Sequence, residues 1–130
     1  MKTIAFVDET TAGSRGDAWH LEIFEEELSL RELIRRRVYQ EVAEYNAETP
    51  EVFSGLVQPG DAEMTLNGYR MRKRRKVDPQ RQFELAVEAF GRNGFVVLVD
   101  DRQVEGLDEM IHIERASEVT FLKLVPLVGG

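Results

Sequence analysis

The chain of 130 residues ends in two glycines, and this ending offers the clearest chemistry in the sequence. Because glycine has no Cβ, an extended Gly-Gly segment can enter a narrow slot and bring its backbone close to a nucleotide. A terminal carboxylate is ionised at neutral pH and is a poor acyl donor until it is activated. The candidate site residues are therefore Gly129 and Gly130, together with Pro126, Leu127 and Val128 before them. A Gly-Gly ending alone is equally typical of a frayed terminus, so the rest of the sequence decides between these interpretations.

A second candidate is a basic run in a chain whose formal net charge is −7. Its positive residues are Arg70, Arg72, Lys73, Arg74, Arg75 and Lys76. Such a run can contact phosphates or an acidic protein surface, and a solvated strand and loop is the alternative interpretation. Because the chain as a whole is acidic, we expect a protein-docking patch here rather than a nucleic-acid interface.

No other residues point to catalysis or metal binding by the chain itself. It contains no cysteine, and His20 and His112 lack a matching set of ligands. The carboxylate pairs at 100–101 and 108–109 are predicted in turns, without a pocket for acid–base work. No phosphate-binding G-x-x-x-x-G-K-[ST] loop and no stretch near the roughly 18 apolar residues of a membrane helix is present. We expect a cytoplasmic, single-domain protein that is not an enzyme and that binds no metal or cofactor.

The N-terminal third predicts a hairpin followed by a helix. Thr3–Val7 is an apolar strand, and a turn from Asp8 to Asp17 leads to Trp19–Phe24, where apolar residues alternate. Ser29-Leu30-Arg31-Glu32 is a capping box, after which apolar residues recur at helical spacing to about Asn46.

Three side chains in this part have predicted places. Trp19 and Phe24 are expected to anchor the core or the hairpin, and the stem of Arg37 is expected to cover the core edge.

The middle of the chain predicts a second hairpin and a second helix. Phe53–Val57 is a short strand, and Asn67-Gly68 predicts a two-residue type I′ turn between strands at 62–66 and 69–72. Asp78-Pro79 opens a helix that ends at Gly91 to Gly94. The apolar stripe of this helix is predicted to consist of Phe83, Val87 and Phe90.

The C-terminal part predicts strands. Phe95–Val99 is an almost continuous apolar run, which favours a central strand. Gln103–Val104 is a short strand, Leu107–Ile113 is a return segment, and Glu118–Val125 is the final strand.

The predicted element order is a hairpin, a capped helix and further strands, the last of which is central. This is the order of an α+β ubiquitin-like β-grasp, in which a mixed sheet wraps around a helix. Residues 97–113 and 118–124 with the Gly-Gly end resemble the last half of ubiquitin and the sulfur carriers related to the molybdopterin-synthase small subunit. The Pro126–Gly130 ending is closer to the sulfur carriers, because ubiquitin-type tails carry arginines there. Residues 47–94 fall outside the resemblance and are interpreted as an inserted hairpin and helix within one domain, between 1–46 and 95–130.

The resemblance implies that a partner E1-like enzyme, using ATP and Mg²⁺ that this chain does not bind, adenylates the Gly130 carboxylate. Gly130 then carries the reactive carbonyl carbon, and the partner recognises Gly129 and the tail residues Pro126, Leu127 and Val128. In a modifier, the acyl group passes through E1-like and E2-like thioesters to target lysines, and a JAB-type peptidase removes it. Resembling bacterial operons include some associated with antiphage defence. In a sulfur carrier of the molybdopterin or thiamine type, the adenylate becomes a thiocarboxylate. Three alternatives remain. The size of the insertion favours the modifier, whereas the proline and apolar residues of the tail favour the sulfur carrier. The third alternative is a β-grasp adaptor that binds partners without being conjugated.

Overall fold

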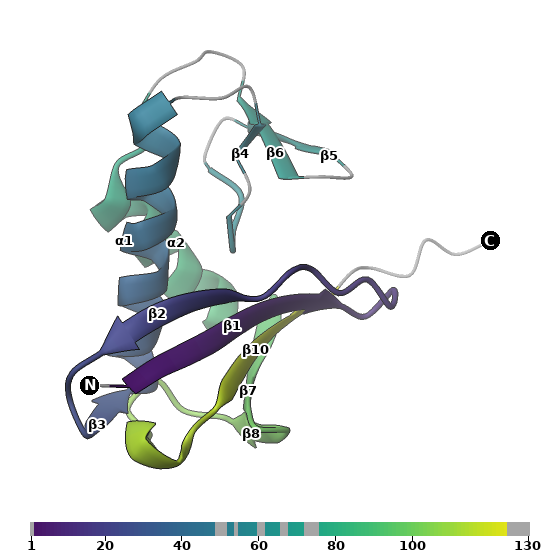
Figure 1. Cartoon of the computed structure of the whole chain (residues 1–130). Coiled ribbons are helices and arrows are strands. Elements are labelled where there is room, and N and C mark those ends of the chain that lie inside the picture. Colours follow the sequence, from purple (N-terminus) through teal and green to yellow (C-terminus); the bar gives the residue numbers. More distant parts are fainter. Residues whose placement is uncertain are drawn as a thin grey trace. The chain divides into compact units, whose positions relative to one another are not determined.

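A computed structural model describes residues 2–48, 52–53, 55–59, 62–65, 68–71 and 76–124. The architecture is α+β, with a mixed sheet of five strands and two α-helices (Figure 1), and it fits a β-grasp-like arrangement. The chain forms two compact units. Unit 1 comprises residues 1–32 and 90–130, and unit 2 comprises residues 33–89.

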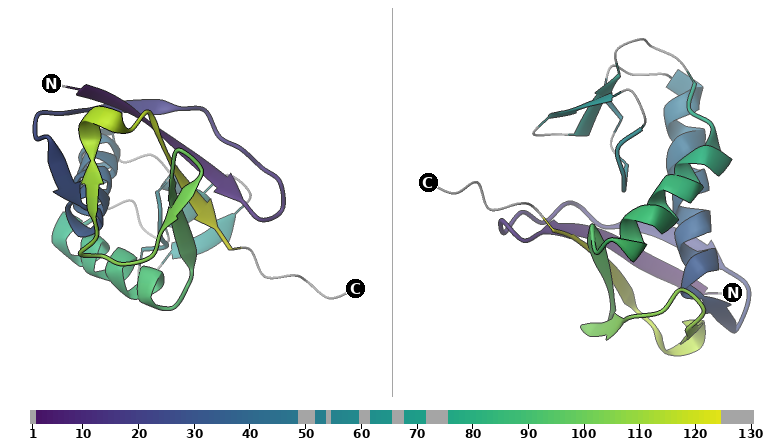
Figure 2. Two further views of the ribbon diagram at one scale, coloured as in Figure 1. Left: turned by 90° about the horizontal axis from the view of Figure 1, so that it is seen from below. Right: turned by 180° about the vertical axis from the view of Figure 1, so that it is seen from behind.

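The main sheet belongs to unit 1. Its strands are β2 (Trp19–Ile23), β1 (Lys2–Thr10), β10 (Glu118–Lys123), β7 (Phe95–Val99) and β8 (Arg102–Val104), in that spatial order. β10 runs parallel to β1, and every other neighbouring pair in the sheet is antiparallel. The C-terminal strand therefore lies in the middle of the sheet, as Figures 1 and 2 show. The predicted N-terminal hairpin is confirmed, and β7 has a neighbour on each side, as predicted.

One face of this sheet, here called the inner face, carries the core of unit 1. Phe6, Val97 and Phe121 on this face are fully buried. The rings of Phe6 and Phe121 lie 5.7 Å apart in an edge arrangement, and Trp19 meets Phe6 edge-on at 4.8 Å. Such edge contacts add about 0.5–1.5 kcal/mol to the burial of each pair. The prediction that Trp19 anchors the hairpin is confirmed.

Two N-terminal predictions are wrong. β1 continues to Thr10 instead of turning at Asp8, because residues 8–10 pair in register with residues 121–123 of β10. Phe24 is 72% exposed and anchors no core. β2 ends at Ile23, and the chain then turns into the short strand β3 (Glu27–Ser29), which pairs with β9 (Met110–His112).

Helix α1 (Leu30–Glu48) begins where the capping box predicts it. The Ser29 Oγ accepts a hydrogen bond of 3.1 Å from the backbone N–H of Glu32, which satisfies one of the free donors of the first turn. The backbone N–H groups of Leu30 and Arg31 donate to the carbonyls of Glu109 and Leu107. The start of the helix is thus held by unit 1 residues from a distant part of the sequence.

Unit 2 contains a three-stranded sheet with the order β4 (Val52–Phe53), β6 (Gly68–Met71), β5 (Ala62–Thr65). The predicted second hairpin is confirmed, but its turn is shifted by one residue. Thr65 pairs with Gly68, whose φ of 149° favours glycine, so Gly68 belongs to β6 and not to the turn. The predicted turn residue Asn67 lies outside the described residues. The predicted strand Phe53–Val57 is also too long, since Gly55–Pro59 are not in a strand.

Helix α2 (Pro79–Gly91) begins and ends as predicted. The Asp78 carboxylate accepts a hydrogen bond from the backbone N–H of Gln80, at 3.1 Å. The predicted stripe is wrong by one position, because the fully buried residues are Gln82 and Ala86 whereas Phe83, Val87 and Phe90 are only half-buried. The Gln82 Nε2 donates to the Val57 carbonyl at 2.7 Å, so a polar side chain occupies the buried position with its hydrogen bond made.

The prediction that Arg37 covers the edge of the core is wrong, because Arg37 is buried in an ion pair. The Arg37 side chain is 1% exposed and pairs with Glu41 one turn along α1. The other Glu41 oxygen accepts a hydrogen bond of 3.0 Å from the backbone N–H of Leu56. At Gly55, an added Cβ would lie 2.8 Å from a Glu41 oxygen and closer still to the Phe53 ring, so a side chain at this position would force Phe53 and Glu41 to shift. The sequence placed Arg37 beside the apolar stripe correctly, but it did not show that Glu41, the partner of Arg37, also bonds to the distant Leu56 backbone.

Candidate functional site at the end of the C-terminal strand

The residues predicted to carry the chemistry follow the end of β10. Gly129, Gly130 and the predicted recognition residues Pro126, Leu127 and Val128 lie outside the described residues. Leu124 is described, and its backbone N–H donates to the Gly94 carbonyl at 3.1 Å. The structure therefore defines the strand from which the Gly-Gly segment continues.

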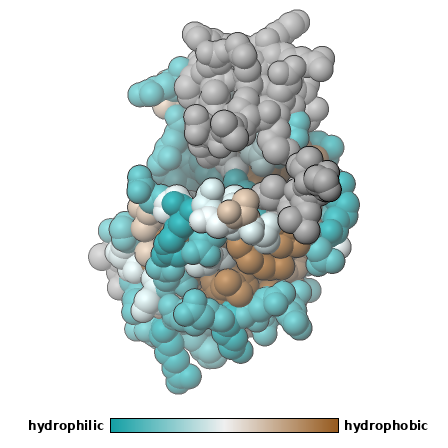
Figure 3. Space-filling model, turned by 90° about the vertical axis from the view of Figure 1, so that its right-hand side faces the viewer, coloured by the Kyte–Doolittle hydropathy of each residue, from teal (hydrophilic) through white to brown (hydrophobic). Residues whose placement is uncertain are grey.

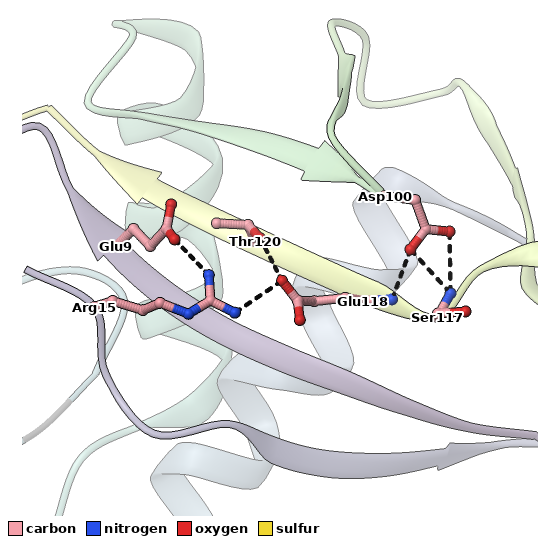
Figure 4. Close-up of polar contacts among 6 residues, drawn as sticks. All are labelled: Glu9, Arg15, Asp100, Ser117, Glu118 and Thr120. Carbon is pink, nitrogen blue, oxygen red and sulfur yellow. Dashed lines mark hydrogen bonds and ion pairs between the residues drawn. The ribbon is translucent and has the colours of Figure 1, made fainter. Parts of the chain in front are cut away.

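β10 is held at both of its ends. At the far end, the Thr11 N–H donates to the Lys123 carbonyl at 3.0 Å, which extends the pairing with β1. At the near end, the Asp100 carboxylate accepts hydrogen bonds from the backbone N–H groups of Ser117 and Glu118, at 3.0–3.2 Å (Figure 4). With ladder partners on both sides as well, the base of the tail has a fixed position and direction.

The tight turn that supplies Asp100 contains two residues with positive φ. Asp100 and Asp101 have φ values of 47° and 71° and connect β7 to β8, since Val99 pairs with Arg102. A two-residue turn of this kind needs left-handed backbone at both positions, which glycine adopts at lower cost than aspartate. The predicted turn at 100–101 is confirmed, and its first aspartate also fixes β10.

Substitutions at the two turn positions are expected to have opposite effects on stability. Asp101→Gly removes left-handed strain at an exposed residue, so we expect it to stabilise the chain by about 0.5–1 kcal/mol. Asp100→Gly relieves similar strain but leaves the Ser117 and Glu118 N–H groups without their acceptor, so we expect a net loss of about 1–3 kcal/mol. Urea unfolding of both variants measures the two values. A stabilised D100G variant would show that the carboxylate does not hold the strand.

An ion-pair network crosses β1 and β10 near the middle of the sheet (Figure 4). Arg15, which is half exposed, donates to Glu9 of β1 and, at 3.0 Å, to Glu118 of β10. The Thr120 hydroxyl donates to the same Glu118 oxygen at 3.4 Å. The hydrogen bonds to Glu9 and then to Glu118 raise the pKa of Arg15 above its ordinary value, so this guanidinium stays charged at any physiological pH.

The face of the main sheet opposite the core, here called the outer face, carries a patch of apolar side chains next to the end of β10. Leu122 lies opposite Val96, and Leu98 is opposite Thr120, on the face that alternates with the buried Phe121 and Val97. Leu124 follows two positions after Leu122 and is 40% exposed. Figure 3 shows the patch in brown, with hydrophilic residues around it. We name this set of residues, Val96, Leu98, Leu122 and Leu124, the outer patch.

Sequence reasoning missed the outer patch. The run Phe95–Val99 is apolar at every position, so its sequence has no period that separates a buried face from an exposed one. In the structure Phe95 and Val97 are buried, whereas Val96 and Leu98 are only half-buried. The pairing of β7 with β10, and not the composition of either strand, brings the four side chains together.

Charge is distributed unevenly between the two units. Unit 1 contains 15 acidic and seven basic side chains, a formal charge of −8, whereas unit 2 contains nine acidic and ten basic side chains, a formal charge of +1. The outer patch and the end of β10 belong to the strongly acidic unit.

The basic run predicted as a docking patch belongs to unit 2. Arg70 lies in β6 opposite Val52 and Glu63, and Lys76 is exposed. Arg72, Lys73, Arg74 and Arg75 lie outside the described residues, so docking at this run stays a prediction.

The two histidines are not brought together. His20 is exposed in β2, and the His112 Nδ1 lies 2.9 Å from a Glu27 carboxylate oxygen across the β3–β9 pair. In the described ranges, no group of three or more His, Cys, Asp or Glu side chains is arranged to hold a metal ion. Neither helix, over the residues that the structure describes, is long and apolar enough to cross a membrane.

No protein-family model, curated protein or solved structure matches this chain. The function is therefore inferred from the residues and geometry of the chain itself.

Proposed function

We propose that this chain is a ubiquitin-like protein modifier that is activated at Gly130 and joined to lysines of target proteins in the cytoplasm. The place of β10 carries the proposal. This strand lies between β1 and β7 in a mixed sheet, is held at both ends, and leads into the sequence Pro-Leu-Val-Gly-Gly. A resemblance to ubiquitin implies the same order of hairpin, capped helix and central last strand.

The proposed chemistry uses the Gly130 carboxylate as acyl group and takes place on partner enzymes. One carboxylate oxygen attacks the α-phosphorus of ATP, so an acyl-adenylate forms and pyrophosphate leaves. A partner thiolate then attacks the carbonyl carbon, the acyl–phosphate bond breaks, and AMP leaves. Finally a lysine amine displaces the thiolate, which recovers a proton as the isopeptide bond forms. This chain contributes no thiol to these steps because it contains no cysteine.

The outer patch is the surface on which we expect the adenylating partner to dock. It lies on β10, which leads into the tail, and on the neighbouring strand β7, so a protein bound there contacts the base of the tail at Leu124. From Leu124, the six residues to Gly130 span at most about 20 Å when extended. Because unit 1 has a formal charge of −8, we expect the docking surface of the partner to combine an apolar centre with a basic surround.

Replacement of Leu124 by aspartate is expected to weaken this docking without unfolding the chain. Leu124 is 40% exposed, so the folded state tolerates the carboxylate, but an apolar anchor is lost and a charge is buried in the complex. We expect the Kd for the adenylating partner to rise at least about tenfold. Phe24→Asp is the matched control, since Phe24 is also exposed but follows the end of β2 that pairs with Lys2, far from Lys123. Equal loss in both variants would place the docking surface elsewhere.

Mass spectrometry of the chain expressed in its own host tests the proposed function. Trypsin cuts after Lys123, so a target lysine should carry the seven-residue remnant Leu124–Gly130. Incubation with ATP and an E1-like adenylating enzyme from the same host should yield the acyl-adenylate and then acceptor-linked species. AMP formation from ATP shows that the enzyme is active. If neither the acyl-adenylate nor an acceptor-linked species appears under such conditions, the proposal is wrong.

The sulfur carrier is the second candidate, because the tail contains proline and apolar residues and lacks arginine. The same experiment separates it from the modifier. In a carrier, a sulfide equivalent from a donor protein displaces AMP, and the intact mass rises by the difference between sulfur and oxygen. An unchanged mass with partner binding retained indicates the third candidate, the non-conjugated adaptor.

A further inference from the structure

The loop between β1 and β2 folds back on the sheet beside the base of the tail. The Gly16 N–H donates to the Asp8 carbonyl at 2.8 Å, and the Thr10 N–H donates to the Ser14 carbonyl at 2.9 Å. Residues 11–16, here called the flanking loop, begin at Thr11, whose N–H is bonded to the Lys123 carbonyl. The flanking loop therefore meets the end of β10 at Thr11, while residues 14–16 bond to the edge of β1 that faces away from β10.

Arg15 is the side chain that ties the flanking loop to two strands at once. Its two terminal nitrogens donate to Glu9 of β1 and Glu118 of β10, and Figure 4 shows all three side chains together on the same side of the sheet as Thr120. The Arg15 side chain is 50% exposed, and ion pairs with this exposure contribute little to overall stability. The Arg15 ion pairs therefore contribute little to stability but fix the position of the flanking loop, which suits a positioning role.

We propose that Arg15 is a positioning residue for the activation of Gly130, because it holds the flanking loop against β1, the strand that borders the proposed docking surface of the adenylating partner on β10. This inference rests on the proposed function. Loss of Arg15 frees the flanking loop, and the Thr11–Lys123 hydrogen bond at the base of the tail becomes easier to open. Docking then requires that the loop be ordered again, which raises KM, whereas the acyl transfer itself is unaffected once the tail is held by the enzyme.

Variants at Arg15 and at a matched arginine test the inference. Arg15→Ala is compared with Arg102→Ala, which removes the same charge from an exposed position in β8. We expect R15A to raise the KM for this chain in ATP–pyrophosphate exchange at least about fivefold, with kcat within about twofold and Tm within about 3 °C of wild type. R102A should leave KM unchanged. Arg15→Lys retains the charge but not the two-armed geometry, so an intermediate KM is expected.

Hydrogen exchange gives a readout that does not depend on the enzyme. The Thr11 amide should exchange at least about fivefold faster in R15A, while amides in the centre of β7 keep their protection. Two results would overturn the inference for Arg15 but leave the proposed function standing. In one, wild type is active and R15A has the same KM. In the other, the Thr11 amide exchanges at the same rate in both chains. A wild-type chain that supports no exchange of pyrophosphate overturns the proposed function, and the role of Arg15 with it.

Discussion

A chain that lacks Gly129 and Gly130 is expected to form no covalent adduct with any target, although it unfolds at nearly the same temperature as the full chain. The reactive carbonyl is lost, and the new terminal carboxylate belongs to Val128, whose branched side chain does not fit a slot shaped for glycine. We expect at least about a hundredfold loss of adenylation and a change in Tm of no more than about 2 °C, because terminal residues contribute little stability. Intact-mass analysis and a thermal melt measure the two quantities.

A variant of equal length shows whether adenylation needs only a terminal carboxylate at the right distance or also needs residues without a Cβ atom. Replacement of both glycines by alanine retains the terminal carboxylate at the same distance from Leu124 but adds two Cβ atoms. We expect adenylation to proceed at least about tenfold more slowly than in wild type, yet measurably. If the deletion lowers Tm by more than about 5 °C, the tail is part of the folded core and the proposed function is wrong.

Substitution of Arg37 is expected to be the most destabilising single change in unit 2. Arg37→Met fills a similar volume but leaves Glu41 buried without this cation, a situation that typically costs about 3–5 kcal/mol. Arg81→Ala is the control, because Arg81 and Glu84 form a helical pair that is half exposed, and its loss should cost no more than about 0.5 kcal/mol. Urea unfolding followed by circular dichroism, which is dominated by the helices, reports the difference.

A double variant tests whether charge or hydrogen bonding is the cause. In R37M/E41Q both charges are removed, and the amide oxygen introduced at position 41 can still accept from the Leu56 N–H. We expect it to be more stable than R37M alone by about 1–3 kcal/mol. Trp19, the single tryptophan, lies in unit 1, so its fluorescence shows whether the two units unfold together. Equal stability of R37M and the double variant would indicate that lost packing, rather than the unpaired charge, is responsible.

Local signals in the sequence predicted most of the secondary structure. The alternation in Trp19–Ile23, the capping box at Ser29 and the Asp78-Pro79 start of α2 each act over a few neighbouring residues, so the sequence contains their full physical cause. Errors arose where partners are distant. β1 extends to Thr10 because β10 offers it a parallel partner, and Phe24 is exposed because β3 pairs with β9 instead of continuing the hairpin.

The candidate site divides in the same way. The Gly-Gly ending, the apolar residues before it and the absence of cysteine are properties of the sequence, and they set the proposed chemistry. The outer patch, the Arg15–Glu118 ion pair and the Asp100 contacts to Ser117 and Glu118 join residues 17 to 103 positions apart. No pattern within one strand predicts such contacts, because the free energy that creates them comes from pairing across the sheet.

The sequence by itself determined most of the element types, the charge and the residues proposed for acyl transfer, since propensity, capping and functional-group chemistry are local. The tertiary structure decided which strand lies in the middle of the sheet, which side chains of the uniformly apolar strand β7 remain partly exposed, and which loop borders the tail. The physical reason is that strand register assigns each side chain to a face, and register depends on a partner strand that is distant in the sequence.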